Sequence, residues 1–133
     1  MKAIYLALLA GSLGACEKDA ASPAQTVDLV YQQPATVVAG GPVEATFTAV
    51  SESRCPSDLT CITGGTVAVT VTLAETGRAQ TVRLGYDRSY TQDSAQVTLH
   101  GQAYWLRLLA VAPYPSTKNG NLPKTATLRL RPQ

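Results

Sequence analysis

Hydrophobic and polar residues alternate along most of the chain from about residue 27 onward. The clearest example is the run from Thr66 to Leu73, in which every second residue is strongly apolar: Val67, Val69, Val71 and Leu73. Successive side chains of a strand point to opposite faces, so a period of two is what a half-buried antiparallel strand requires. No segment after residue 27 shows a convincing helical period.

The same pattern predicts seven or eight strands in all. The other runs lie at 27–31, 36–38, 43–50, 82–86, 96–99, 104–111 and 126–131. In the run at 43–50, the alternation predicts one buried face made by Val43, Ala45, Phe47 and Ala49. Trp105 lies in the run at 104–111, and we expect it to pack in the core because Trp is highly buried on average.

Turn residues separate these runs. Gly40-Gly41-Pro42, Glu75-Thr76-Gly77 and His100-Gly101-Gln102 predict short connections, whereas residues 113–123 form a longer loop containing three prolines. Short strands with turns at this spacing predict one all-β domain over residues 27–133. We expect an antiparallel β-sandwich of the immunoglobulin-like kind, with a small closed barrel as the alternative.

Two of the three cysteines, Cys55 and Cys61, lie close together between the runs at 43–50 and 66–73. Pro56, Ser57 and Asp58 between them favour a chain reversal, which could bring the two cysteines within disulfide range. We predict a Cys55–Cys61 disulfide that fixes a local corner, since a loop this short yields only about 2 kcal/mol of stabilisation. Gly64 and Gly65 follow and would allow a positive φ or a bulge.

Other interpretations of this cysteine pair fit less well. A zinc site needs four ligands, and the chain has one histidine, His100, and one further cysteine. A redox pair usually has CxxC spacing, and two free thiols would require a reducing compartment. The sequence therefore predicts no metal and no cofactor.

The N-terminus resembles an export signal. Lys2 precedes the apolar run Ala3 to Leu9, small residues follow, and the segment is too short for a permanent membrane span. Its end, Leu13-Gly14-Ala15-Cys16, resembles the lipobox of bacterial lipoproteins. This resemblance implies a signal peptide at 1–15 that is cleaved before Cys16, and lipid chains (palmitate-type) on Cys16. The alternative is an ordinary secretory signal.

Residues 16–26 are small and polar and would form a lipid-anchored tether. By analogy with lipoprotein sorting, Glu17 after the anchor favours the outer membrane of a bacterial cell envelope over the inner membrane. The chain has 11 Lys and Arg against 9 Asp and Glu, so it has no basic field for nucleic acid. The expected partner is the membrane, through Cys16, with a protein or cell-wall partner in addition.

Three short motifs extend the resemblance: ESRCP at 52–56, CITGG at 61–65 and LRLLAVAPYP at 106–115. Together they resemble a group of small uncharacterised bacterial lipoproteins and secreted proteins with a DSRCP-type disulfide corner. Glu52 and Thr63 depart from the usual pattern, in which Asp and an aromatic residue stand there. The resemblance implies a cell-envelope β domain and no particular activity.

A search for catalytic groups yields little. His100 is beside a turn glycine, no GxSxG nucleophile motif occurs, and nothing in the sequence brings the acidic residues together. The best candidate for a binding loop is 85–96, with Tyr86, Asp87, Arg88, Tyr90 and Asp93. Alternate acidic and hydroxyl residues from 87 to 93 faintly resemble a calcium loop, but the glycine and the terminal glutamate of that loop are missing.

The sequence therefore favours a non-enzymatic envelope lipoprotein that binds a partner or supports the envelope. Two alternatives remain open. One is an inhibitor of a protease or lysozyme that uses the disulfide corner or the 85–96 loop as a wedge. The other is an enzyme with a dispersed carboxylate site.

Overall fold

The computed structural model describes residues 23–86 and 92–133, and they form an antiparallel all-β domain. Its strands are β1 (Gln25–Val30), β2 (Pro34–Val38), β3 (Pro42–Glu52), β4 (Val67–Glu75), β5 (Arg78–Tyr86), β6 (Ser94–Leu99), β7 (Gln102–Ala112) and β8 (Thr125–Pro132). Each of the eight predicted runs corresponds to one of them. The first strand begins two residues before the expected start of the domain at residue 27.

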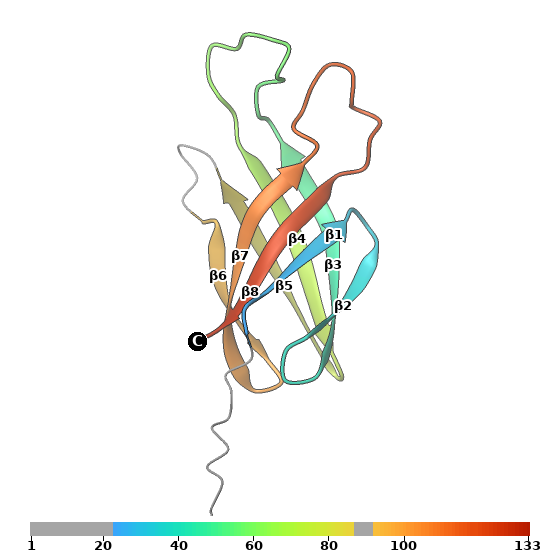
Figure 1. Ribbon diagram of the computed structural model, residues 1–133, viewed down its shortest axis with the longest axis vertical. Coiled ribbons are helices and arrows are strands. Elements are labelled where there is room, and N and C mark those ends of the chain that lie inside the picture. Colours follow the sequence, from blue (N-terminus) through green and yellow to red (C-terminus); the bar gives the residue numbers. More distant parts are fainter. Residues whose placement is uncertain (1–22, 87–91) are drawn as a thin grey trace, which may run out of the picture.

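Two four-stranded sheets pack face to face (Figure 1). One has the order β1-β8-β7-β6 and the other β2-β3-β4-β5. The sheets do not close into a barrel, so the predicted sandwich is confirmed over its alternative. The chain crosses from one sheet to the other twice, between β1 and β2 and between β5 and β6. None of the described residues belongs to a helix long and apolar enough to cross a membrane.

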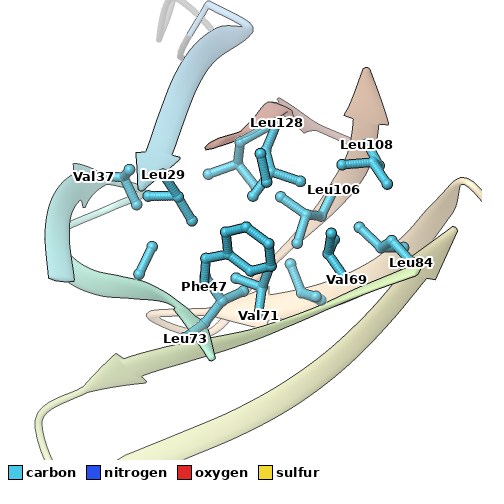
Figure 2. Packing of buried hydrophobic residues seen from close by; sticks show 14 of the residues in the cluster. Leu29, Val37, Phe47, Val69, Val71, Leu73, Leu84, Leu106, Leu108 and Leu128 are labelled. Atoms are coloured by element: carbon cyan, nitrogen blue, oxygen red, sulfur yellow. The ribbon is translucent and has the colours of Figure 1, made fainter. Parts of the chain in front are cut away.

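The core lies between the sheets and is built from the apolar face of each strand. Phe47 of β3 is fully buried, and leucine and valine side chains from both sheets surround it (Figure 2). Tyr31 contacts the Phe47 ring edge-on, with ring centroids 5.3 Å apart. The alternations predicted for β4, β6 and β8 are confirmed, since their predicted inward residues, Val67 to Leu73, Val97 and Leu99, and Ala126 to Leu130, are buried.

Two predictions of inward-facing residues were wrong. The β3–β4 register shifts between Phe47 and Ala49, so the extra residue turns Ala49 outward and exposes it. Trp105 is also exposed, because Tyr104 and Leu106 on either side of it take the buried positions. The larger ring therefore lies on the outer face of the β1-β8-β7-β6 sheet, next to the buried Tyr104.

The two ends of the sandwich are connected differently. At one end the strands are joined by tight turns, including the two-residue loop His100-Gly101, where both residues have positive φ (47° and 76°), as a type I′ hairpin turn requires. Two long loops, 53–66 between β3 and β4 and 113–124 between β7 and β8, lie side by side at the other end (Figure 1). We call these two loops together the tip.

Candidate functional site

The two loops of the tip are bonded to each other. The backbone N–H of Ser57 donates to the carbonyl oxygen of Pro115 at 2.9 Å. Asp58 accepts hydrogen bonds from both the backbone N–H of Thr117, at 3.0 Å, and the Thr117 hydroxyl. These bonds lower the pKa of the exposed Asp58 carboxyl. The loops therefore form one unit although Asp58 and Thr117 are 59 positions apart in the sequence.

The first loop is closed at two levels. The predicted disulfide is present, with the Cα atoms of Cys55 and Cys61 5.9 Å apart. At the base of the loop, the backbone N–H of Ser53 donates to the Thr66 carbonyl at 2.8 Å, and the Thr66 N–H donates to Ser53 Oγ at 3.0 Å. The loop is thus constrained at this base, the Ser53–Thr66 pair, which we call its neck, as well as by the disulfide.

Gly65 is required at this neck for a reason that the sequence did not indicate. A Cβ atom at residue 65 would overlap the backbone carbonyl of Ser53, whereas a Cβ at Gly64 would meet nothing within 4 Å. Among the described glycines, positive φ occurs at Gly40, Gly77 and Gly101. The close approach of two backbones, and not a positive φ, is therefore what excludes a side chain at residue 65.

Beneath the loops lies a buried arginine. The Arg54 side chain is only 7 % exposed and forms a bidentate pair with Glu52, with Nε–Oε1 at 2.8 Å and Nη2–Oε2 at 2.7 Å. Arg54 Nη2 also donates to the carbonyl oxygen of Val111 in β7 at 3.1 Å. A buried guanidinium is tolerated only when it is paired and hydrogen-bonded in this way.

Two tyrosines complete the surroundings of Arg54. Its Cζ atom lies 4.6 Å from the centroid of the Tyr114 ring and 6.0 Å from that of Tyr86, both within the range of cation–π attraction. The Tyr86 hydroxyl accepts from Arg54 Nη1 at 3.2 Å and from the Val111 N–H at 3.3 Å. Tyr86 therefore joins the end of β5 to β7 and to the arginine.

Lys124 provides a second cation for Glu52. Its Nζ lies 3.1 Å from Glu52 Oε2 and donates to the Pro113 carbonyl at 3.0 Å. Burial by itself raises the pKa of Glu52, but the hydrogen bonds from Arg54 and Lys124 and the Arg54 charge outweigh it and leave that pKa lowered. The cluster of Glu52, Arg54, Tyr86, Tyr114 and Lys124, which we call the arginine cluster, thus connects both loops to the sandwich.

Apolar side chains project from the tip into solvent. The Ile62 side chain, directly after the disulfide, is fully exposed, and Leu59, Tyr114 and Leu122 are each at least half exposed. Four of the seven large exposed apolar residues in the described chain lie on these two loops. Apolar residues gathered at one end of a domain are typical of an interaction surface.

The predicted binding loop is divided between two places. Tyr86 belongs to the arginine cluster, whereas Asp93 bonds to Arg107 on the outer face of the other sheet, with Oδ2–Nε at 3.1 Å. Asp87, Arg88 and Tyr90 lie outside the described residues, as does Cys16. The structure therefore does not bring Tyr86 and Asp93 together into one site.

Sequence reasoning missed Arg54 and Lys124. A signal for Arg54 was present, since Glu52 and Arg54 are two residues apart at the end of a strand and so project to the same side. Lys124 had no such signal, because it meets Glu52 only through the fold. In residues 23–86 and 92–133, no three His, Cys, Asp or Glu side chains gather as a metal site would need.

Comparison with known proteins adds nothing to this description. The chain matches no family model, no curated protein and no solved structure.

Proposed function

We propose that the protein is a lipid-anchored, non-enzymatic domain of the bacterial cell envelope that binds another protein through its tip. The observation that carries this proposal is the exposure of Leu59, Ile62, Tyr114 and Leu122 on loops that the disulfide and the arginine cluster hold in place. Side chains that are already ordered lose less conformational entropy when a partner binds. The tip therefore has both the composition and the rigidity of a binding surface.

The direction of β1 places the tip at the end of the domain opposite the proposed tether. Gln25 pairs with Leu130 and Val30 pairs with Thr125, so β1 runs toward the 113–124 loop and begins at the opposite end of the sheet (Figure 1). A tether from Cys16 would reach the domain at Gln25. The tip would then be the end of the domain farthest from the tether, where a partner could reach it.

The anchor is tested by the intact mass of the native protein. We expect a chain that begins at Cys16 and carries the added mass of two or three acyl chains, because a single chain binds membranes only marginally. A Cys16→Ser variant is the matched control and should lose this mass and its membrane retention. An unacylated native chain would contradict this part of the proposal and leave the ordinary secretory signal.

The partner is tested by site-specific photo-crosslinking in intact cells. A photoreactive residue at position 62 or 122 should yield a discrete crosslinked protein. One at position 83, where Arg83 is exposed on β5 of the β2-β3-β4-β5 sheet, should not. An Ile62→Asp substitution should then weaken the crosslink formed from position 122. Crosslinks of equal yield from all three positions, or from none, would contradict binding at the tip.

The disulfide loop favours one second candidate, an inhibitor of a protease or lysozyme. Ile62 is fully exposed directly after Cys61, on a loop closed by a disulfide and by Ser53 and Thr66. A pre-organised loop of this kind suits insertion into an enzyme cleft. Inhibition assays with secreted proteases and lysozymes test this candidate, and Ile62→Asp should abolish any inhibition found.

The carboxylate-enzyme alternative has less support from the described acidic groups. Glu52 is bound by Arg54 and Lys124, Asp58 by Thr117, and Asp93 by Arg107. Each of these carboxylates is therefore engaged by a different neighbour, and paired acid–base chemistry needs two that converge on one substrate. Screening the purified protein against glycoside and ester substrates, with Asp58→Asn and Asp93→Asn variants, tests this alternative.

A further inference from the structure

A shallow hollow lies on the outer face of the β1-β8-β7-β6 sheet, distinct from the tip. Its volume is about 460 Å³, within the usual range for small-molecule sites. The lining is basic and aromatic, with a single acidic side chain: Asp93, Ser94, Trp105, Arg107, Arg129 and Arg131. Three arginines on one small surface stand out in a chain whose net charge is only +2.

Strand register places two of these arginines directly opposite each other on neighbouring strands. Arg107 of β7 is directly opposite Arg129 of β8, and Trp105 is directly opposite Arg131. Like charges directly opposite each other on a sheet are destabilising. Asp93 bonds to Arg107 at 3.1 Å, and within the described residues no carboxylate lies within ion-pair distance of Arg129 or Arg131. An anion bound in the hollow would relieve this repulsion.

The hollow also lies beside the strand that leads to the proposed anchor. Thr26 of β1 pairs with Arg129, and Gln25 pairs with Leu130. Cys16 and Gln25 are nine positions apart, so even a fully extended tether reaches no more than about 30 Å. A lipid on Cys16 would therefore keep the hollow within reach of the membrane surface.

We propose that this hollow binds the phosphate headgroup of an anionic phospholipid in the membrane that holds the Cys16 anchor. Arginine pairs well with phosphate, and an exposed Trp is suited to the boundary between headgroups and acyl chains. The contact would be a second membrane signal beside the acyl chains and would fix the domain's orientation. This inference rests on the anchor of the proposed function, which supplies the membrane, but is independent of the partner at the tip.

The chain's single tryptophan is Trp105, so its fluorescence reports on the hollow directly. The native acylated protein is reconstituted in phosphatidylcholine vesicles with and without phosphatidylglycerol. With phosphatidylglycerol we expect a blue shift of the emission and less quenching by acrylamide. Arg129→Gln combined with Arg131→Gln should lower the ratio of docked to undocked protein roughly 25-fold, or about fivefold for each arginine.

The matched control removes the same charge from the other sheet. Arg78→Gln combined with Arg83→Gln alters two exposed arginines of β5 and should leave the phosphatidylglycerol-dependent shift unchanged. The proposal is overturned if both vesicle types give the same emission, or if both double variants behave alike. It is also overturned if inorganic phosphate or an acidic oligosaccharide, added without vesicles, reproduces the full shift, since the hollow would then bind soluble anions.

Failure of this proposal can be distinguished from failure of the anchor. If the intact mass shows no acyl chains, the anchor fails, and vesicles added to the unacylated protein still test whether phosphatidylglycerol changes the Trp105 emission. If acyl chains are present and the emission does not respond to phosphatidylglycerol, only the hollow's role fails.

Discussion

The two ends of this sandwich solve the same problem, the connection of antiparallel strands, in opposite ways. At the hairpin end, Thr76-Gly77 and His100-Gly101 each join two strands with two residues, and a glycine with positive φ completes each turn. At the tip, loops of more than ten residues run between the strands without regular structure. Short turns are specified by their own sequence, whereas long loops need contacts from elsewhere in the fold.

The arginine cluster supplies those contacts. Arg54 and Lys124 both bind Glu52, one from each loop, and the tyrosines Tyr86 and Tyr114 enclose the arginine. A sandwich that needed only to connect its strands could use tight turns at both ends. The long loops, held by a buried ion-pair cluster, therefore go beyond what connecting the strands requires.

Among the changes considered, loss of the buried arginine should destabilise the tip most. Arg54→Met leaves the Glu52 carboxylate with Lys124 as its one remaining cation among the described residues, and removes the bond to the Val111 carbonyl. We expect a loss of about 3–5 kcal/mol of unfolding free energy, as is typical when one partner of a buried pair is removed. Urea denaturation followed by Trp105 fluorescence measures this loss.

Two further variants distinguish the loss of a buried ion pair from the loss of a positive charge in general. Glu52→Leu combined with Arg54→Met removes both charges and should be more stable than Arg54→Met alone, because no carboxylate is left without its arginine. Arg83→Met, at an exposed position on β5, should change stability by no more than about 0.5 kcal/mol. If Arg54→Met matched Arg83→Met, the arginine would not stabilise the tip.

The neck of the first loop should tolerate no side chain at residue 65. Gly65→Ala forces a Cβ into the Ser53 carbonyl, and we expect a loss of about 3 kcal/mol, at the upper end for overpacking, because backbone cannot yield as a side chain can. Gly64→Ala is the matched control, since its Cβ would meet nothing within 4 Å. Thermal unfolding of both variants measures the difference, and equal melting temperatures would show that the neck can open.

Removal of the disulfide should affect the tip more than the rest of the domain. For the double variant Cys55→Ser and Cys61→Ser we expect a loss of about 2 kcal/mol, the loop-entropy value for so short a loop. Hydrogen exchange should become faster at the Leu59 amide, which donates to the Pro56 carbonyl within the disulfide loop. It should stay unchanged at hairpin-end amides such as that of Gln102, which pairs with Leu99. Equal acceleration at both ends would mean that the bond supports the whole fold.

Much of the fold could be predicted from the sequence because each strand carries its own alternation. The pattern from Val67 to Leu73, for example, repeats without interruption, and the structure follows it. The prediction failed at Ala49, where a bulge shifts the phase within an alternating run, and at Trp105, where Tyr104 took the core position. The bulge at Ala49 has no local sequence signal, because it depends on how β3 pairs with β4. The outward position of Trp105 did have one, since residues two apart share a face and Trp105 is two residues from the charged Arg107.

The candidate site was less predictable than the strands. The Cys55–Cys61 pair is local, and its spacing and turn residues pointed to a disulfide. The bonds from Glu52 to Lys124 and from Asp58 to Thr117 join residues 72 and 59 positions apart. Such pairs form only when the two sheets pack together and bring the two long loops side by side, so a single sequence gives no indication of them.

Acid should weaken the tip through Glu52. The pKa of Glu52 is lowered in the folded protein, so its stabilisation is complete above the unfolded-state pKa of about 4.3 and is lost as pH falls through the lower folded value. We expect the melting temperature to fall more steeply with decreasing pH below about 5 in the wild type than in Glu52→Gln. Parallel slopes would assign the acid sensitivity to other carboxylates.

The smallest effect is expected where the two loops meet at the surface. Asp58 is fully exposed, and bonds of exposed charged groups contribute little to stability, so Asp58→Ala should leave the melting temperature nearly unchanged. It removes the acceptor of the Thr117 amide, however, and exchange of that amide should become faster. The Leu122 amide, which donates to the Asn119 carbonyl within the same loop, serves as the control and should exchange at its usual rate. If both amides accelerated, Asp58 would order the whole second loop and the two loops would move as one. If neither did, the arginine cluster and the Ser57–Pro115 hydrogen bond would hold the loops together without Asp58.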